Sequence, residues 1–155
     1  MHGLYPCYFS ESEQNKELLM TQFESHSAHE VFPCIDEPAA KATFDLTLTT
    51  EDNIAVLSNT PVVDQKTTGK TMVTTFETTP KMSTYLLAFV AGDLVYKETA
   101  NRHGVKIRVY ATPNHKHELD FALENAAKFL DFYNDYFKLP YPLPKCDLVA
   151  CPDFS

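Results

Sequence analysis

The sequence predicts a mainly β fold with one long helix, in which an antiparallel β-sandwich is followed by a β-α-β segment. Three observations predict it. Short apolar runs alternate with polar residues over about the first 100 residues, with turns at the spacing typical of a sandwich. A single stretch of helical period follows. Strand patterns lie on both sides of this helix, which is the order expected of a β-α-β unit.

The first two strands are expected at Gly3–Phe9 and Glu17–Glu24, joined by a polar loop over Ser10–Lys16. Side chains alternate between the two faces of a strand, so Gln22 and Glu24 are expected to point the same way. The alternation divides the return strand into two sets: Leu19, Thr21 and Phe23 on one face, and Met20, Gln22 and Glu24 on the other.

A helical turn is expected at Asp36–Lys41, followed by a half-buried strand at Thr43–Thr50 with Phe44, Leu46 and Leu48 inward. The apolar run Tyr85–Ala91 predicts a strand covered on both faces. The remaining strands expected in this part of the chain are Ile54–Ser58, Lys70–Thr78 after a turn at Gly69, and Leu94–Thr99.

The pattern changes near residue 101. A strand that begins at Val105 and ends at Thr112-Pro113 precedes a helix over about residues 117–137, and Cys146–Cys151 is expected to be a final buried strand. Prolines after Lys138 end the helix. Its apolar stripe consists of Leu119, Ala122, Ala126, Phe129, Leu130, Tyr133 and Phe137. About 55 residues are too few for a complete domain, so we expect a truncated second domain, whose uncovered apolar surface would favour self-association.

Composition excludes several partners. The chain has 13 Lys and Arg against 21 Asp and Glu, a net charge of -8, which argues against nucleic acid and anionic membranes. No apolar run approaches the length of a membrane span. No signal peptide is recognised, so we expect a cytoplasmic location. The four cysteines are expected to be free thiols: Cys7, Cys34, Cys146 and Cys151.

Two His-Glu pairs suggest a zinc site but fail its spacing. The motif H-E-x-x-H needs a second histidine four residues after the first, and here Pro33 follows His29 and Phe121 follows His117 at that position. We expect His115 and His117 to be solvated. The acidic pair Asp36-Glu37 precedes Pro38 and is expected to be a structural corner.

Gln22 and Glu24 admit two interpretations. They could form the polar, solvent-facing edge of a sheet. Alternatively, Glu24 could present a carboxylate to a cationic ligand, with the Gln22 amide beside it to orient that ligand. Their spacing leaves both open.

The chain resembles the M1 zinc aminopeptidases, particularly their puromycin-sensitive and oxytocinase-like branch. The resemblance is collinear over nearly the whole chain. The residues that carry it are Thr21-Gln-Phe-Glu24, Phe32-Pro-Cys-Ile-Asp-Glu-Pro38, Lys41-Ala-Thr-Phe44, Lys81-Met-Ser-Thr-Tyr-Leu-Leu-Ala-Phe89, Val105-Lys-Ile-Arg-Val-Tyr110 and Tyr136-Phe-Lys-Leu-Pro-Tyr-Pro-Leu-Pro-Lys145.

This resemblance implies that residues 1–100 are part of an N-terminal β-saddle domain and that residues 101–155 open a thermolysin-like catalytic domain. It implies zinc in the full-length parent. The family's H-E-x-x-H motif would follow this chain, so we expect no zinc and no activity in these 155 residues alone. The implied partners are peptide N-termini and the remainder of the catalytic domain.

The resemblance also assigns two site residues. Glu24 matches the glutamate that holds the substrate's α-amine, and Gln22 matches the glutamine lining the pocket for the first side chain. The sequence departs from the family pattern at His29 and Glu30, where basic residues are common.

Two other readings remain open. A non-catalytic scaffold of the same fold would act as a protein-interaction module, although it would have no need of Gln22 and Glu24. An unrelated β-sandwich binding module would not explain the collinear motifs.

Overall fold

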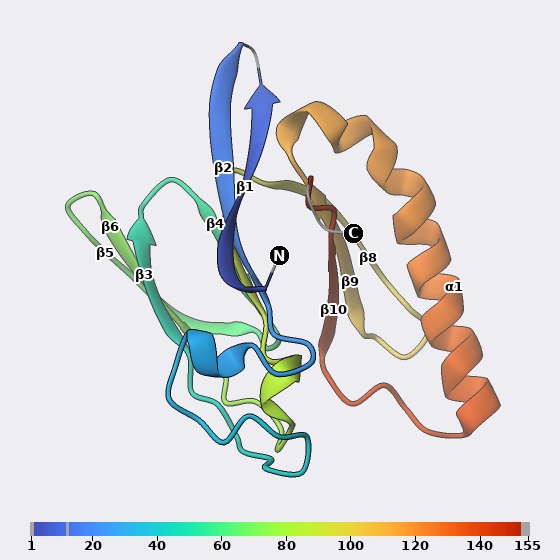
Figure 1. The fold of residues 1–155 in the computed structure, drawn as a ribbon. Coiled ribbons are helices and arrows are strands. Elements are labelled where there is room, and N and C mark those ends of the chain that lie inside the picture. The colour runs from blue at the N-terminus through green and yellow to red at the C-terminus, as the bar shows by residue number, and fades with distance from the viewer. Residues whose placement is uncertain (1, 12, 153–155) are drawn as a thin grey trace. The chain divides into compact units, whose positions relative to one another are not determined.

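The computed structural model describes residues 2–11 and 13–152, which form two compact units (Figure 1). The first contains the described residues up to Asp93, together with Pro152, and the second is Leu94–Cys151. Strand Val95–Ala100 hydrogen-bonds only within the second unit's sheet, so it is grouped there. The mainly β architecture with one α-helix, and its antiparallel sheets, confirm the predicted fold class.

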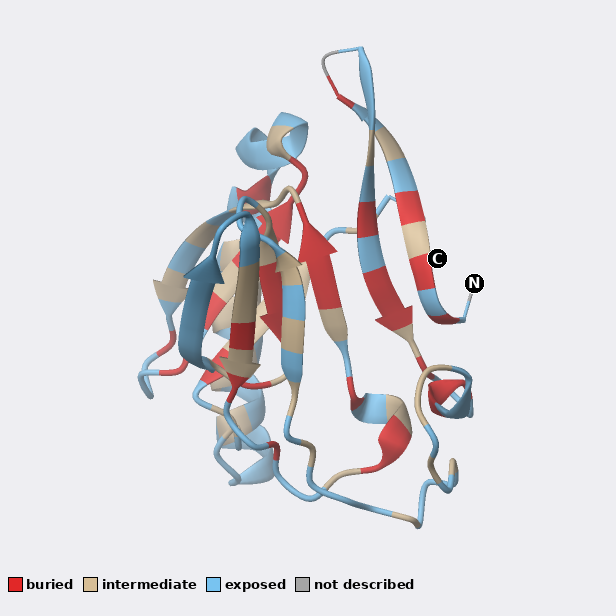
Figure 2. Ribbon diagram, turned by 90° about the vertical axis from the view of Figure 1, so that its left-hand side faces the viewer, coloured by how far each residue is buried: buried red, intermediate tan, exposed pale blue. Residues whose placement is uncertain are grey.

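The first unit contains a four-stranded antiparallel sheet in the order β1-β2-β7-β4. Buried and exposed residues alternate along its first strand, as Figure 2 shows, because one face of the strand packs inward. The bounds of the four strands are β1 Gly3–Glu11, β2 Gln14–Gln22, β7 Phe89–Gly92 and β4 Ala55–Ser58.

The β1-β2 hairpin is tighter than predicted. Its strands pair from Gly3 with Gln22 to Glu11 with Gln14, so the expected loop over residues 10–16 is wrong. Glu13 takes a left-handed conformation, φ 65°, in the connection. Lys16, expected in the loop, instead lies in β2, where its Nζ is 2.6 Å from Glu11 Oε2.

A second sheet in the first unit has the order β3-β6-β5, with β3 Thr47–Glu51, β6 Thr71–Phe76 and β5 Val62–Thr68. The inward positions predicted for Phe44, Leu46 and Leu48 are confirmed, because these side chains are half-buried between exposed neighbours. Strand β5 was not predicted. Every residue of β5 is exposed, so it carries no apolar alternation.

The run Tyr85–Ala91 is not one strand covered on both faces. Its start forms a 3-10 turn, η2 Thr84–Leu86, and only its end joins β7. Leu87 is buried while Leu86 is 47% exposed, so the run changes direction between the turn and the strand. Gly92 ends β7 where a Cβ would lie 2.2 Å from Leu18 Cδ2 and 3.2 Å from Leu18 Cα, so any larger residue would displace the Leu18 side chain.

Two of the apolar clusters formed by described residues lie in the first unit. Buried Phe23, Ala28 and Leu87 form one, against which Phe32 and Phe44 pack. The other consists of Val56, Phe76 and Ala91 with partly buried Leu46, Leu48, Ile54 and Met72. Phe23 and Ala28 of the first cluster belong to the segment that follows β2.

The second unit is the predicted β-α-β arrangement plus one strand. Its sheet has the order β10-β9-β8, in which β9 and β10 are parallel and β8 is antiparallel to β9. A parallel pair requires a crossover, which α1 provides. The bounds are β8 Val95–Ala100, β9 Lys106–Ala111, the 3-10 segment η3 Pro113–Glu118, α1 Leu119–Phe137 and β10 Lys145–Val149.

The apolar stripe of α1 is only half covered. Leu119, Ala122 and Leu123 pack against Val109, Ala111 and Leu148 of the sheet. The stripe residues Phe129, Tyr133 and Phe137 are 58%, 49% and 64% exposed, so the last turns of the stripe are uncovered. Further exposed apolar residues near this end are Phe132, Tyr136 and Leu139. Among the described residues, no helix has the length and hydropathy of a membrane span.

Candidate functional site

Gln22 and Glu24 lie next to each other where β2 ends. Gln22 is the last residue of the strand and is half-buried, whereas Glu24 is exposed in the turn that follows. The prediction that the strand continues to Glu24 is therefore wrong. The Glu24 backbone N–H donates to Gln22 Oε1 at 3.3 Å, so the amide side chain helps to set the course of the chain at Glu24.

The alternation predicted for the return strand holds only in part. Thr21 and Phe23 are buried, but Leu19, predicted on the same face, is 42% exposed, and Met20, predicted on the opposite face, is buried. Thr21 is buried because its hydroxyl accepts from Phe89 N at 3.0 Å and donates to Phe89 O at 3.4 Å. This side-chain contact with β7 fixes the strand one residue before Gln22.

We call residues 23–27 the Glu24 turn. Its ends are joined by a hydrogen bond from Ser27 N to Phe23 O at 2.9 Å. Phe23 is 1% exposed and makes edge contacts with Phe32 and Phe89 at ring-centroid distances of 6.0 and 6.4 Å. Ala28, directly after the turn, is fully buried. Glu24 is thus an exposed carboxylate on a turn with buried residues at both ends.

The pair His29-Glu30 has structural contacts, as expected when the zinc motif failed. These residues lie in a 3-10 turn, η1 Ala28–Glu30. His29 Nδ1 is 3.0 Å from Asp36 Oδ2, and Glu30 Oε2 is 2.8 Å from His2 Nδ1.

The acidic corner contains a carboxylate, that of Asp36, whose side chain is buried and hydrogen-bonded. The Asp36 side chain is 7% exposed and accepts from His29 N at 3.0 Å and from Thr84 Oγ1 at 2.6 Å. Burial raises the pKa of Asp36, but the hydrogen bonds from Thr84 and His29 outweigh it and lower that pKa to about 2. The helical turn expected here is a short turn, with Ala40 N donating to Glu37 O at 3.0 Å.

The second histidine pair is solvent-exposed, as expected. His115 Nδ1 and His117 Nε2 lie 3.0 and 3.4 Å from the same Glu118 carboxylate oxygen, on η3. Within residues 2–11 and 13–152, no group of three or more His, Cys, Asp or Glu could hold a metal ion. The described residues therefore do not fit a zinc site.

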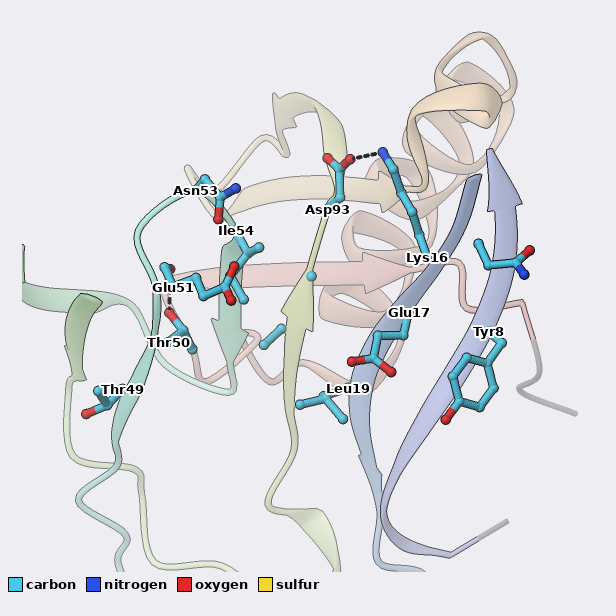
Figure 3. Close-up of a pocket in the computed structure, with 13 residues that line it drawn as sticks. Tyr8, Lys16, Glu17, Leu19, Thr49, Thr50, Glu51, Asn53, Ile54 and Asp93 are labelled. Atoms are coloured by element: carbon cyan, nitrogen blue, oxygen red, sulfur yellow. Dashed lines mark hydrogen bonds and ion pairs between the residues drawn. The ribbon is translucent and has the colours of Figure 1, made fainter. Parts of the chain in front are cut away.

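An open pocket of about 790 Å³ lies elsewhere on the first unit (Figure 3). Lys16 Nζ at its rim is 2.6 Å from Asp93 Oδ2, and hydrogen bonds with Asp93 and Glu11 raise the Lys16 pKa. Tyr8, Glu17 and Leu19 of the hairpin face Thr49, Glu51 and Ile54. Neither Gln22 nor Glu24 lines this pocket, so it is separate from the predicted site.

The second unit holds a charged cluster that sequence reasoning missed. The Arg108 guanidinium contacts both Asp147 carboxylate oxygens at 2.8 Å, and Lys145 Nζ lies 2.6 Å from Asp147 Oδ2. The Lys145 and Asp147 side chains are only 7% and 6% exposed, and burial lowers the Lys145 pKa. In the sequence, Arg108 and Asp147 are polar residues between apolar neighbours in two strands. Such a pattern normally indicates the solvent-facing side of a sheet.

Comparisons with known proteins agree with the resemblance. The family model described as the peptidase M1 N-terminal domain matches residues 1–86, and that of the peptidase family M1 domain matches residues 121–155. The chain belongs to the M1 peptidase family. Members of this family are metallopeptidases, so the chain is related to hydrolases.

M1 relatives match the whole chain. It is 45% identical to a puromycin-sensitive aminopeptidase of Caenorhabditis elegans and 47% identical to an aminopeptidase N of Lactococcus lactis subsp. lactis. It is 41% identical to aminopeptidase M1 of Arabidopsis thaliana. The chain spans 17%, 19% and 18% of the length of these three relatives, so most of each M1 relative has no counterpart in this sequence.

Proposed function

We propose that this chain is part of a zinc metallo-aminopeptidase, in which Glu24 binds the substrate's α-amine and Gln22 contacts the first side chain. The observation that carries the proposal is the Glu24 turn: an exposed carboxylate whose flanking residues Phe23 and Ala28 are buried. None of the ion pairs between described residues includes Glu24, so its charge is available to a ligand.

The chemistry suits a free peptide N-terminus. An α-amine has a pKa of about 7.7–8.0 and is largely protonated at neutral pH. A carboxylate at a closed end of a groove stabilises that charge and offers nothing to an internal peptide segment. This is the difference between an exopeptidase and an endopeptidase.

The position of Gln22 supports a secondary role. Its Oε1 accepts from Glu24 N at 3.3 Å, so the amide is held beside the carboxylate by the chain itself. A residue that contacts the first substrate side chain has to lie next to the group that binds the amine, and Gln22 meets that requirement.

We assign residues 1–100 to part of the N-terminal β-saddle domain and residues 101–155 to the start of the thermolysin-like domain. The remainder of the catalytic domain is the proposed partner of the exposed aromatic end of α1, where Phe129, Phe132 and Tyr136 are more than half exposed. The relatives are several times longer than this chain, which supports such a partner.

The zinc motif would lie in that remainder, because the 155-residue sequence contains no H-E-x-x-H. We therefore propose that the isolated chain is inactive, binds no zinc and self-associates through its exposed apolar side chains. A cytoplasmic location belongs to the same proposal.

The proposal is tested by Glu24→Ala in the full-length protein that contains this chain. Losing one partner of a desolvated charge pair costs about 2–5 kcal/mol, so kcat/KM on an aminoacyl amide should fall about 30-fold or more while zinc content is unchanged. The matched control is Glu17→Ala, an exposed glutamate on β2, the strand that leads into the Glu24 turn. Equal kcat/KM for wild type and Glu24→Ala would reject the role of Glu24.

A full-length protein with no aminopeptidase activity and no zinc would instead favour a non-catalytic M1-like scaffold that acts as a protein-interaction module. In that case the exposed end of α1 and the open pocket, not Glu24, would be the surfaces to test for a partner.

A further inference from the structure

We propose that Asp36 is a positioning residue for Glu24, and this inference rests on the proposed function of Glu24 as the amine-binding group. Asp36 lies twelve positions after Glu24 in the sequence. It touches neither Gln22 nor Glu24 in any described hydrogen bond, so its effect must pass through other residues.

The Asp36 carboxylate joins three backbone segments. Oδ2 accepts from the N–H of His29 and contacts its ring, which fixes both the backbone and the side chain of η1. Oδ1 accepts from the Thr84 hydroxyl at 2.6 Å, which ties the acidic corner to η2. A carboxylate with two charge-assisted contacts on one oxygen and one on the other has a defined orientation.

A continuous set of contacts leads from Asp36 to the Glu24 turn. The ring of His26 is stacked on the ring of His29, with centroids 6.4 Å apart and planes inclined by 10°. His26 Nδ1 is 2.7 Å from Ser25 Oγ, and Ser25 directly follows Glu24. Each contact in the series joins two side chains, from the buried carboxylate to the residue beside the proposed amine ligand.

The contact between His26 and His29 matters because it lies at the exposed centre of the Glu24 turn, which apolar packing does not hold. Phe23 and Ala28 anchor the ends of the turn in the apolar cluster, but Glu24, Ser25 and His26 are all exposed. Packing therefore fixes the ends of the turn and leaves its centre to polar contacts. The Glu24 N–H donates to Gln22 Oε1 on one side of this centre, and the stacked His26 ring, held through His29 by Asp36, constrains it on the other.

Replacing Asp36 with asparagine keeps the shape of the side chain and removes its charge. We expect the turn to keep its buried ends while its centre becomes less constrained, so that the Glu24 carboxylate is presented less often in the orientation that binds an amine. In the full-length enzyme KM for an aminoacyl amide should rise about tenfold, the effect of one charge-assisted hydrogen bond, while kcat changes little.

A double-mutant cycle separates positioning from general damage. Kinetics are compared for wild type, Glu24→Ala, Asp36→Asn and the double variant, because residues that act as one unit have non-additive effects. If Asp36 acts through Glu24, adding Asp36→Asn to Glu24→Ala changes KM less than twofold. The matched control is Asp45→Asn, since Asp45 also accepts from a threonine hydroxyl, that of Thr78, in the same unit.

The outcomes are distinct. A rise in KM for Asp36→Asn that disappears in the Glu24→Ala background, with no rise for Asp45→Asn, supports the proposal. Additive effects, or unchanged KM for Asp36→Asn while Glu24→Ala is impaired, overturn the positioning role alone. Unchanged kinetics for Glu24→Ala reject the proposed function itself, and with it this inference.

Discussion

The ionised Asp36 carboxylate is expected to raise the free energy of unfolding, and this can be tested on the 155-residue chain alone. Its pKa is lowered from 3.8 to about 2 in the folded chain by Thr84 and His29, although burial opposes the shift. One pKa unit corresponds to about 1.4 kcal/mol, so the folded state gains about 2 kcal/mol from the ionised carboxylate. The Asp36 residue as a whole is only half-buried, so solvent screening makes about 2 kcal/mol the upper end of this gain.

The sign of the pH dependence follows from the direction of the shift. A carboxylate with a lowered folded-state pKa stabilises the protein above its unfolded-state pKa, near 3.8, where it is ionised in both states. The contribution is lost as the pH falls from about 4 through about 2, because the folded state must then take up the proton. Wild type should therefore exceed Asp36→Asn by up to about 2 kcal/mol at pH 6, and the difference should shrink below pH 4.

Urea unfolding followed by circular dichroism at pH 6, 4 and 2.5 measures this difference. Asp45→Asn provides the control, because Asp45 also accepts a threonine hydroxyl but is exposed. A difference between wild type and Asp36→Asn that is absent at pH 6, or that is the same at pH 6 and 2.5, would refute the reasoning.

Two other regions give further predictions. Asp147→Ala removes the carboxylate shared by Arg108 and Lys145, so we expect the free energy of unfolding in urea to fall by about 3–5 kcal/mol. A fall of less than about 1 kcal/mol would show that the cluster does not stabilise the fold. Phe132 is 56% exposed on α1, so Phe132→Lys should increase the monomer fraction of the isolated chain in sedimentation velocity. The same exchange at exposed Val63 is the control, and equal monomer fractions for the two variants would contradict association through α1.

Alternation predicted the parts of the fold where one strand face is buried. Phe44, Leu46 and Leu48 are half-buried between exposed neighbours, and the order of strands around α1 follows from the helical period between two strand patterns. Strand β5 escaped prediction because none of its residues is buried. β5 pairs with β6 through backbone hydrogen bonds, and these do not require any particular pattern of apolar side chains.

Apolar runs misled where tertiary contacts change the backbone. The run Tyr85–Ala91 has the composition of a covered strand, yet Thr84 begins a 3-10 turn and donates to Asp36, 48 residues earlier. The exposed end of α1 shows the reverse case. The spacing of its apolar residues predicted the helix correctly. That spacing does not tell whether another surface covers the apolar side of the helix.

The candidate site was reached by resemblance and not by spacing. Period two placed Gln22 and Glu24 on one strand face, while the structure places Glu24 one residue past buried Phe23, in a turn. The contacts of Asp36 could not be predicted, because both of its partners come from separate turns. In the sequence Asp36 was one of two adjacent acids, and only the structure distinguishes its buried carboxylate from that of Glu37.

The central claim is that Glu24 recognises a protonated α-amine, and inhibitor binding tests it most directly. Two competitive inhibitors that differ only in having or lacking the α-amine are compared on full-length wild type and Glu24→Ala. Wild type should prefer the amine-bearing inhibitor, and this preference should fall to about one in Glu24→Ala because the lost charge pair is the only difference between the ligands. A preference that is the same in both proteins would contradict the account.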